Sequence, residues 1–264
     1  MARIAVGLEY DGSAYAGWQA QPTAPSVQAL AERALARVAA APVALVCAGR
    51  TDAGVHALGQ VAHFDSEAQR APRSWVLGAN SELPPDVSLS WAQPVPEHFH
   101  ARFSAETRTY RYLILNRSVR SALQARRAAW IHRPLDVAAM SAAAAHLTGE
   151  HDFSAFRAAQ CQAKSPVRRL LRLEVARRAE FVVIEAEANA FLHHMVRNLA
   201  GLLIAVGKGD TPPAQAATIL AGRDRTRAPA TAPPWGLYFA GVRYPAAFGL
   251  PPGPPPGVLP ADRL

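Results

Sequence analysis

The order of secondary-structure elements along the chain limits the possible folds more than any other feature of the sequence. Apolar residues alternate with polar ones in strand-like runs, and between these runs they recur at helical spacing, once directly after a capping serine, Ser26. The first half of the chain is predicted to contain strands at 4–10, 43–47, 60–64 and 87–91 and helices at 27–38 and 72–80. Its order is therefore strand, helix, strand, strand, helix, strand.

The second half repeats this order in pattern, though not in residues. Asp136 stands at the start of one predicted helix, and residues 177–180 form the turn of a predicted hairpin. The predicted strands are 109–115, 170–176, 181–188 and 236–244, and the predicted helices are 137–147, 192–206 and an inserted one at 213–220. The chain is thus predicted to contain the same βαββαβ unit twice.

This duplication predicts an α+β fold of two ferredoxin-like halves, 1–105 and 106–247, that form one continuous, mainly antiparallel sheet. Helices would cover one face of the sheet, and the other face would be open to a ligand. We expect the functional site in the cleft between the halves. The proline-rich tail, 248–264, is expected to be extended or disordered.

The charge of the chain favours a polyanionic partner. The chain has 264 residues, 28 of them Lys or Arg against 20 Asp or Glu, and Lys164 and Lys208 are its only lysines. Residues 102–133 are rich in arginine and contain one acidic residue, Glu106. Arginine binds phosphate and stacks on bases, which suits nucleic acid. A GC-rich genome would explain the arginine excess equally well.

The cysteines and the N-terminus indicate a cytoplasmic protein that is not bound to a membrane. Cys47 and Cys161 are too few for a disulfide framework, and neither has the nearby second cysteine of a zinc or redox motif. The chain begins with a predicted strand instead of an apolar signal segment, and no uncharged apolar run is long enough to span a bilayer.

A glycine-rich run at 49–64 contains the best candidate for a catalytic group. Asp52 lies close to a basic residue, Arg50, and among Gly49, Gly54 and Gly59, which permit unusual backbone angles and close approach of a ligand. Such a turn would present the carboxylate to a ligand. The alternative is that Asp52 only caps the turn.

Five segments together, in this order, resemble the tRNA pseudouridine synthase A family. They are 10–19 (YDGSAYAGWQ), 49–57 (GRTDAGVHA), 99–105 (FHARFSA), 110–112 (YRY) and 191–198 (FLHHMVRN). The resemblance implies an isomerase that converts uridine to pseudouridine at positions 38, 39 and 40 in the anticodon stem-loop of tRNA. It also implies a homodimer that binds the anticodon arm, and a reaction without a cofactor.

By the same resemblance, Asp52 is the catalytic aspartate. The reaction breaks the N-glycosidic bond and rejoins the base through carbon, so it needs a nucleophile and proton transfers but no redox partner. The carboxylate could attack the ribose anomeric carbon, add to uracil, or remove a ribose proton to give a glycal. The sequence leaves these three routes open.

The resemblance assigns roles to three more residues. Tyr110 would stack on the target base, although Tyr112, on the same strand face, competes for this role. Arg197 would orient the Asp52 carboxylate. Arg50 would help to keep the target nucleotide out of the stack, or else pair locally with Asp52 or contact a phosphate.

The histidines suggest a metal site only weakly. His98 and His100 are expected on one face of a strand, while His193 and His194, adjacent on a helix, should diverge and chelate poorly. We therefore expect no metal. Two rival interpretations are a catalytically inert RNA-binding protein and a metal-dependent hydrolase built on these histidines.

Overall fold

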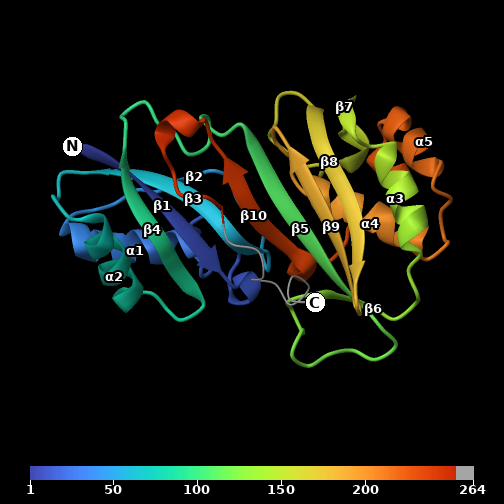
Figure 1. Cartoon of the computed structure of the whole chain (residues 1–264), viewed down its shortest axis with the longest axis horizontal. Coiled ribbons are helices and arrows are strands. Elements are labelled where there is room, and N and C mark those ends of the chain that lie inside the picture. Colours follow the sequence, from blue (N-terminus) through green and yellow to red (C-terminus); the bar gives the residue numbers. More distant parts are fainter. Residues whose placement is uncertain (254–264) are drawn as a thin grey trace. The chain divides into compact units, whose positions relative to one another are not determined.

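The computed structural model describes residues 1–253 and divides into two compact units. Unit 1 contains Met1–Glu106 and, from the far end of the chain, residues 239–253. Unit 2 is the intervening segment Thr107–Tyr238. Each unit has its own strands and its own helices (Figure 1).

Unit 1 is built around a central strand, β1. Its elements are β1 (Ala2–Tyr10), η1 (Gly12–Ala14), α1 (Val27–Ala39), β2 (Val46–Cys47), β3 (His56–Ser66), α2 (Pro72–Glu82) and β4 (Val87–Val95). Strand β1 lies between β4 and β3 and is antiparallel to both. The other edge of β3 pairs with β2 and with β10 (Leu237–Arg243), the strand that returns to this unit. The order β4-β1-β3-β2 is that of a split βαβ arrangement.

The middle of β1 is buried on both faces, where the sequence pattern predicted alternation. Residues 4–8 are all buried. Gly7 leaves room for an indole, because a Cβ there would lie 2.1 Å from Nε1 of Trp91 on β4. Helix α2 packs against both α1 and β4.

The strands of unit 2 pair in a mainly antiparallel manner, and helices pack on them. Its elements are β5 (Thr107–Asn116), β6 (Ala129–Ile131), α3 (Val137–Ala145), β7 (Gly149–Asp152), η2 (Ser154–Phe156), β8 (Val167–Arg178), β9 (Phe181–Ala188), α4 (Met195–Gly207), α5 (Gln215–Gly222), η3 (Arg225–Arg227) and η4 (Pro234–Gly236). The strand order is β5-β9-β8-β7, with β6 parallel to β5. Helix α4 is buried along nearly its whole length, and α3 packs against α4 and β8. The predicted α+β class with a mainly antiparallel sheet is confirmed.

Most predicted elements are present, and the differences have local causes. Helix α1 begins directly after Ser26, and the Asp136 carboxylate caps α3 by accepting a hydrogen bond from the Ala139 N–H at 3.0 Å. Helix α4 begins at Met195 instead of 192, because His194 adopts a left-handed backbone angle, φ 61°. The strands β6 and β7 are not predicted by the sequence.

The C-terminal tail is more ordered at its start than expected. Phe248 ends a short 3₁₀ helix, η5 (Ala246–Phe248), and its ring packs edge-on against Phe99 at 5.1 Å. The rest of the predicted extended tail, residues 254–264, lies outside the described residues. Among residues 1–253, no helix has both the length and the apolar character needed to cross a bilayer.

Candidate active site

Asp52 lies in a tight turn between β2 and β3. The Val55 N–H donates to the Asp52 carbonyl at 3.1 Å, and Gly54 has a positive φ of 77°. Before this turn, the Gln60 side chain donates to the Gly49 carbonyl at 2.7 Å. Asp52 itself is half-buried, between the buried residues Thr51 and Val55. The backbone on both sides of the carboxylate is therefore fixed. Of the three glycines expected to take unusual angles, Gly54 does so, whereas Gly59 lies within β3.

The segment after β1 holds this turn in place. The Trp18 N–H donates to the Thr51 carbonyl at 3.0 Å, and the Gly54 N–H donates to the Tyr15 carbonyl at 3.3 Å. The buried Tyr10 hydroxyl is 2.8 Å from the Thr51 hydroxyl. Residues 10–18 thus support Asp52 from three points. In the sequence, this segment carries part of the family resemblance but no pattern that predicts its contacts with the turn of Asp52.

Two glycines of this segment allow the close contact. Gly17 has φ +100°, and a Cβ there would lie 2.5 Å from the Thr51 carbonyl oxygen. A Cβ on Gly12 would lie 1.9 Å from the Val55 carbonyl oxygen. No larger residue fits at either position without moving the turn that carries Asp52. In the sequence, the sign of this close contact is the pair of glycines five residues apart.

His56, the first residue of β3, completes the packing of the turn. It is 2% exposed, and its Nδ1 accepts a hydrogen bond from the Gly12 N–H at 3.1 Å. The same nitrogen lies 3.2 Å from Oδ1 of Asp11, so His56 contacts two neighbouring residues of the segment 10–18. His56 is thus a structural residue of the loop.

Arg50 lies on the exposed side of the same loop. Its side chain is exposed, and its positive charge acts on the thiol of Cys47 in β2. Burial raises the pKa of this thiol to about 12, although the charges of Arg50 and Arg102 lower it. The charges of Arg50 and Arg102 therefore both act on the Cys47 thiol.

In unit 2, the two candidate tyrosines of β5 differ in their surroundings. Tyr112 is 0% exposed, and its hydroxyl donates to the Pro233 carbonyl at 2.8 Å. Burial raises the pKa of Tyr112. Tyr110 is half-buried, and its ring packs edge-on against Phe191. The two ring centroids are 5.1 Å apart, and the angle between the ring planes is 83°. Of the two, Tyr110 is the one that can contact a ligand.

Arg197 lies in the first turn of α4. Its Nε donates to the Ala232 carbonyl at 2.9 Å, and the Ala232 N–H donates to the Arg197 carbonyl at 3.1 Å. The first bond holds the half-buried Arg197 side chain, and the second joins the backbones of the two residues. The next residue, Asn198, is buried and donates to the Phe156 carbonyl at 2.7 Å.

Two predictions about the histidines are wrong. His193 and His194 do not diverge on a helix: His194 is the left-handed residue before α4, and the two ring centroids are 4.0 Å apart. His98 and His100 are not on a strand, because β4 ends at Val95 and both residues lie in the following loop. Pro94 and Pro96 flank that end of the strand, and proline cannot continue a sheet's hydrogen bonds.

Comparison with known proteins identifies close relatives over nearly the whole chain. A family model described as tRNA pseudouridine synthase matches residues 8–104 and 143–245. The chain is 59% identical to a Methylococcus capsulatus protein over 94% of this chain and 92% of the relative. It is 55% identical to a Paraburkholderia phytofirmans protein over 100% and 97%, and 53% identical to a Coxiella burnetii protein over 95% and 96%. All three relatives are named tRNA pseudouridine synthase A.

Proposed function

This chain belongs to the tRNA pseudouridine synthase family, and from that premise we propose that it modifies uridines 38, 39 and 40 in the anticodon stem-loop. Membership of the family makes the protein an isomerase of uridine in tRNA. The three positions and the catalytic residues given below are our proposal. The observation that supports it most directly is the fixed turn that holds Asp52.

In the proposed reaction, Asp52 is the nucleophile. The bond between N1 of uracil and C1′ of ribose breaks, the base turns, and C5 bonds to C1′. C5 then loses its proton, and N1 ends with a proton in its place, so atoms and electrons balance without an oxidant or reductant. A carboxylate on a fixed backbone can be positioned against the sugar or base with little loss of entropy during the reaction. The route of glycosidic cleavage stays open among the three alternatives.

The other proposed site residues serve the target nucleotide and the carboxylate. Tyr110 stacks on the extruded uracil, a role for which its half-buried ring is suited. Arg197, whose side chain is held by Ala232, pairs with Asp52 and keeps it oriented. Arg50, exposed beside Asp52, keeps the nucleotide out of the stack. The proposal requires these residues to converge when tRNA is bound.

The proposal includes a homodimer in the cytoplasm that binds one anticodon arm across two subunits and uses no metal. Two subunits would share the phosphate contacts, so that the moderate positive charge of one chain, +8, suffices. Assay after dialysis of the enzyme against a chelator tests the independence from metal. Full activity is expected, and lasting loss that zinc restores would contradict this part of the proposal.

Tritium release from unmodified tRNA labelled at C5 of uridine tests the function and the nucleophile together. We expect release from wild type, and a loss of at least about 10³-fold in Asp52→Ala and Asp52→Asn with tRNA binding largely retained. Mapping the modified uridines in the product tests positions 38 to 40. Full release by Asp52→Ala would refute the nucleophile.

A matched control is Asp136→Ala, which removes a carboxylate that caps α3. This change should lower the free energy of unfolding by about 1 kcal/mol and leave tritium release unchanged. The pair separates a chemical role of an aspartate from a structural one.

A further inference from the structure

The loop between β4 and β5 exposes a phenylalanine, Phe103. Its side chain is 75% exposed, compared with 42% for Trp130 and 41% for Trp235. Burial of a phenyl ring is worth roughly 1.5–3 kcal/mol, which this ring largely forgoes. Because single exposed apolar residues are common, this exposure alone indicates nothing about a ligand. The structure around the ring provides the further evidence.

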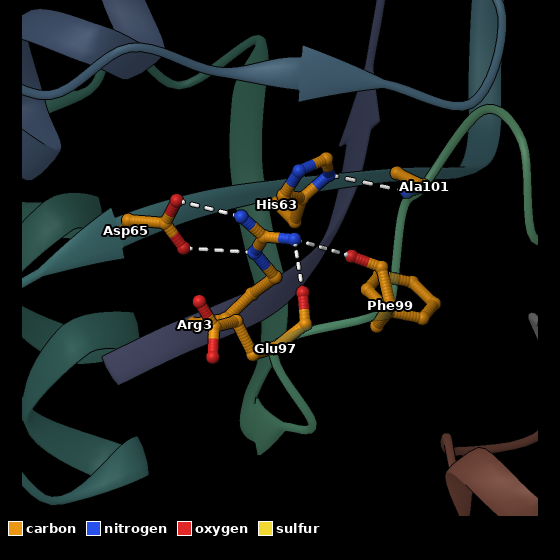
Figure 2. A network of polar contacts seen from close by, with 6 residues as sticks. All are labelled: Arg3, His63, Asp65, Glu97, Phe99 and Ala101. Carbon is orange, nitrogen blue, oxygen red and sulfur yellow. Dashed lines mark hydrogen bonds and ion pairs between the residues drawn. The ribbon is translucent and has the colours of Figure 1, made fainter. Parts of the chain in front are cut away.

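The main chain of this loop is fixed by a network at its base (Figure 2). Arg3 of β1 binds the Asp65 carboxylate through two hydrogen bonds of 2.8 Å. Its remaining nitrogen, Nη1, donates to the carbonyls of Glu97 and, at 3.0 Å, Phe99. One guanidinium thus ties β1 and β3 to the start of the loop.

A buried histidine holds the next part of the loop. Nδ1 of His63 accepts a hydrogen bond from the Ala101 N–H at 3.1 Å (Figure 2). Burial and the charges of His100 and Arg3 lower the pKa of His63 to about 4, so the ring is neutral at pH 7 and keeps its acceptor. On the other side, the Tyr244 hydroxyl donates to the Ala101 carbonyl at 2.6 Å.

The tip of the loop is closed on itself. The His100 N–H donates to the Ser104 hydroxyl at 2.9 Å, and the Ser104 N–H donates to the His100 carbonyl at 2.8 Å. Between these bonds stand Arg102 and Phe103, both exposed. Two solvent-exposed side chains are therefore carried by a backbone that is fixed on both sides.

The groups that surround the Phe103 ring suit a nucleotide. The centroid of the His100 ring is 4.3 Å from that of Phe103, with an angle of 32° between the ring planes. The guanidinium carbon of Arg102 is 5.5 Å from the Phe103 centroid. The charges of Arg102 and of Arg50, two residues before Asp52, both act on the Cys47 thiol. An aromatic ring with an adjacent guanidinium, on the same unit as the proposed nucleophile, offers stacking to a base and charge to a phosphate.

We propose that Phe103 and Arg102 form a subsite for an unpaired nucleotide of the bound tRNA, distinct from the target uridine. The base stacks on Phe103, and Arg102 binds an adjacent phosphate. The subsite rests on the proposed function, since it requires tRNA as the ligand. A protein partner would need a contiguous apolar patch of several hundred Å², whereas the neighbour of Phe103 at the tip is a charged residue.

Equilibrium binding of unmodified tRNA and tritium release, both measured on the full chain, test the subsite. Phe103→Ala should raise Kd and KM roughly 5- to 100-fold and leave kcat within about twofold, because stacking acts on binding. Phe103→Leu should bind as weakly as Phe103→Ala, since it keeps apolar area without an aromatic face. Phe103→Trp should keep the affinity of wild type for tRNA, and bound tRNA should quench the fluorescence of the added indole.

The arginine has a separate signature. Arg102→Ala should weaken binding and reduce the slope of log Kd against log salt by about 1, whereas Phe103→Ala should leave the slope unchanged. Matched controls are Leu77→Ala and Arg73→Ala, both exposed residues of α2. Neither should change Kd more than about twofold.

The possible outcomes distinguish a failure of the Phe103 subsite from a failure of the proposed function. Unchanged Kd in Phe103→Ala, or full affinity in Phe103→Leu, would overturn the subsite even if wild type releases tritium normally. Absence of tritium release from wild type would instead refute the proposed function. Stacking of Phe103→Trp on tRNA would still be measurable by fluorescence in that case.

Discussion

Tyr110 and Tyr112 are two residues apart on one face of β5, yet they occupy different environments. Tyr112 is enclosed and bonded to Pro233, while Tyr110 keeps part of its ring exposed. The alternation of a strand gives both tyrosines the same face, so sequence alone could not choose between them. Burial distinguishes them, and burial depends on the Pro233 segment more than a hundred positions away.

This difference predicts opposite effects of the same substitution. Tyr112→Phe should lower the free energy of unfolding by about 1 kcal/mol through loss of its hydrogen bond and leave kcat unchanged. Tyr110→Phe should keep stability and tRNA affinity. It should slow tritium release, because we propose that the Tyr110 hydroxyl lies near C5 of the stacked uracil, the carbon that loses a proton. Urea unfolding and single-turnover tritium release measure the two effects. The reverse pattern would assign the catalytic role to Tyr112.

The sequence carries signals for the residues of the candidate site but none for Arg3 and His63, which fix the loop that carries Phe103. Asp52, Tyr110, Arg197 and Arg50 were chosen for their chemical type within recognisable motifs. Arg3 and His63 gave no comparable signal, because their partners at 97–101 are brought close only by the pairing of β1, β3 and β4. A lone arginine or histidine in a strand has no pattern of its own.

At the scale of elements, the turn that carries Asp52 and the segment 10–18 are held together by hydrogen bonds. Gly12→Ala inserts a methyl group against the Val55 carbonyl without a strained φ, and Gly17→Ala adds both a contact and a positive φ. We expect each to lower kcat and to cost more than about 1 kcal/mol of stability, with the larger loss in Gly17→Ala. Activity assays and urea unfolding on the same preparations would measure both.

Gly209→Ala is the control for backbone strain, because Gly209 has φ +78° and no atom within 4 Å of a built Cβ. It should lose about 1 kcal/mol of stability and keep full activity. Unchanged kcat in both Gly12→Ala and Gly17→Ala would show that the segment does not position Asp52.

Elements with strong local signals were the ones predicted correctly. The amphipathic helix α1, the helix α3 that Asp136 caps, and the hairpin of β8 and β9 are specified by residues that are near in sequence, although the Ser26 side chain makes no capping hydrogen bond to α1. The strands β6 and β7 have three and four residues, too few for an alternating pattern, and exist because a neighbouring strand offers a free edge. Their existence is a tertiary effect that a local pattern does not contain.

For the whole molecule, the proposed homodimer predicts a mass. Light scattering at the protein concentrations of the activity assay should give twice the mass of one chain without tRNA, and the mass of two chains plus one tRNA when tRNA is bound. Since the proposal has one tRNA contacting both subunits, dilution that produces monomers should also reduce tritium release per chain. A monomer with full specific activity would contradict the dimer.

The return of residues 239–253 to unit 1 has a consequence for the synthesis of the protein. The first 106 residues leave the ribosome early. The edge of β3 that β10 covers stays without this partner until all of unit 2 has been translated. At roughly 5–20 residues per second, that delay is on the order of ten seconds. During it, the nascent unit that carries Asp52 has an unpaired strand edge. Truncation of the chain before residue 239 would therefore damage the part of the protein that is made first.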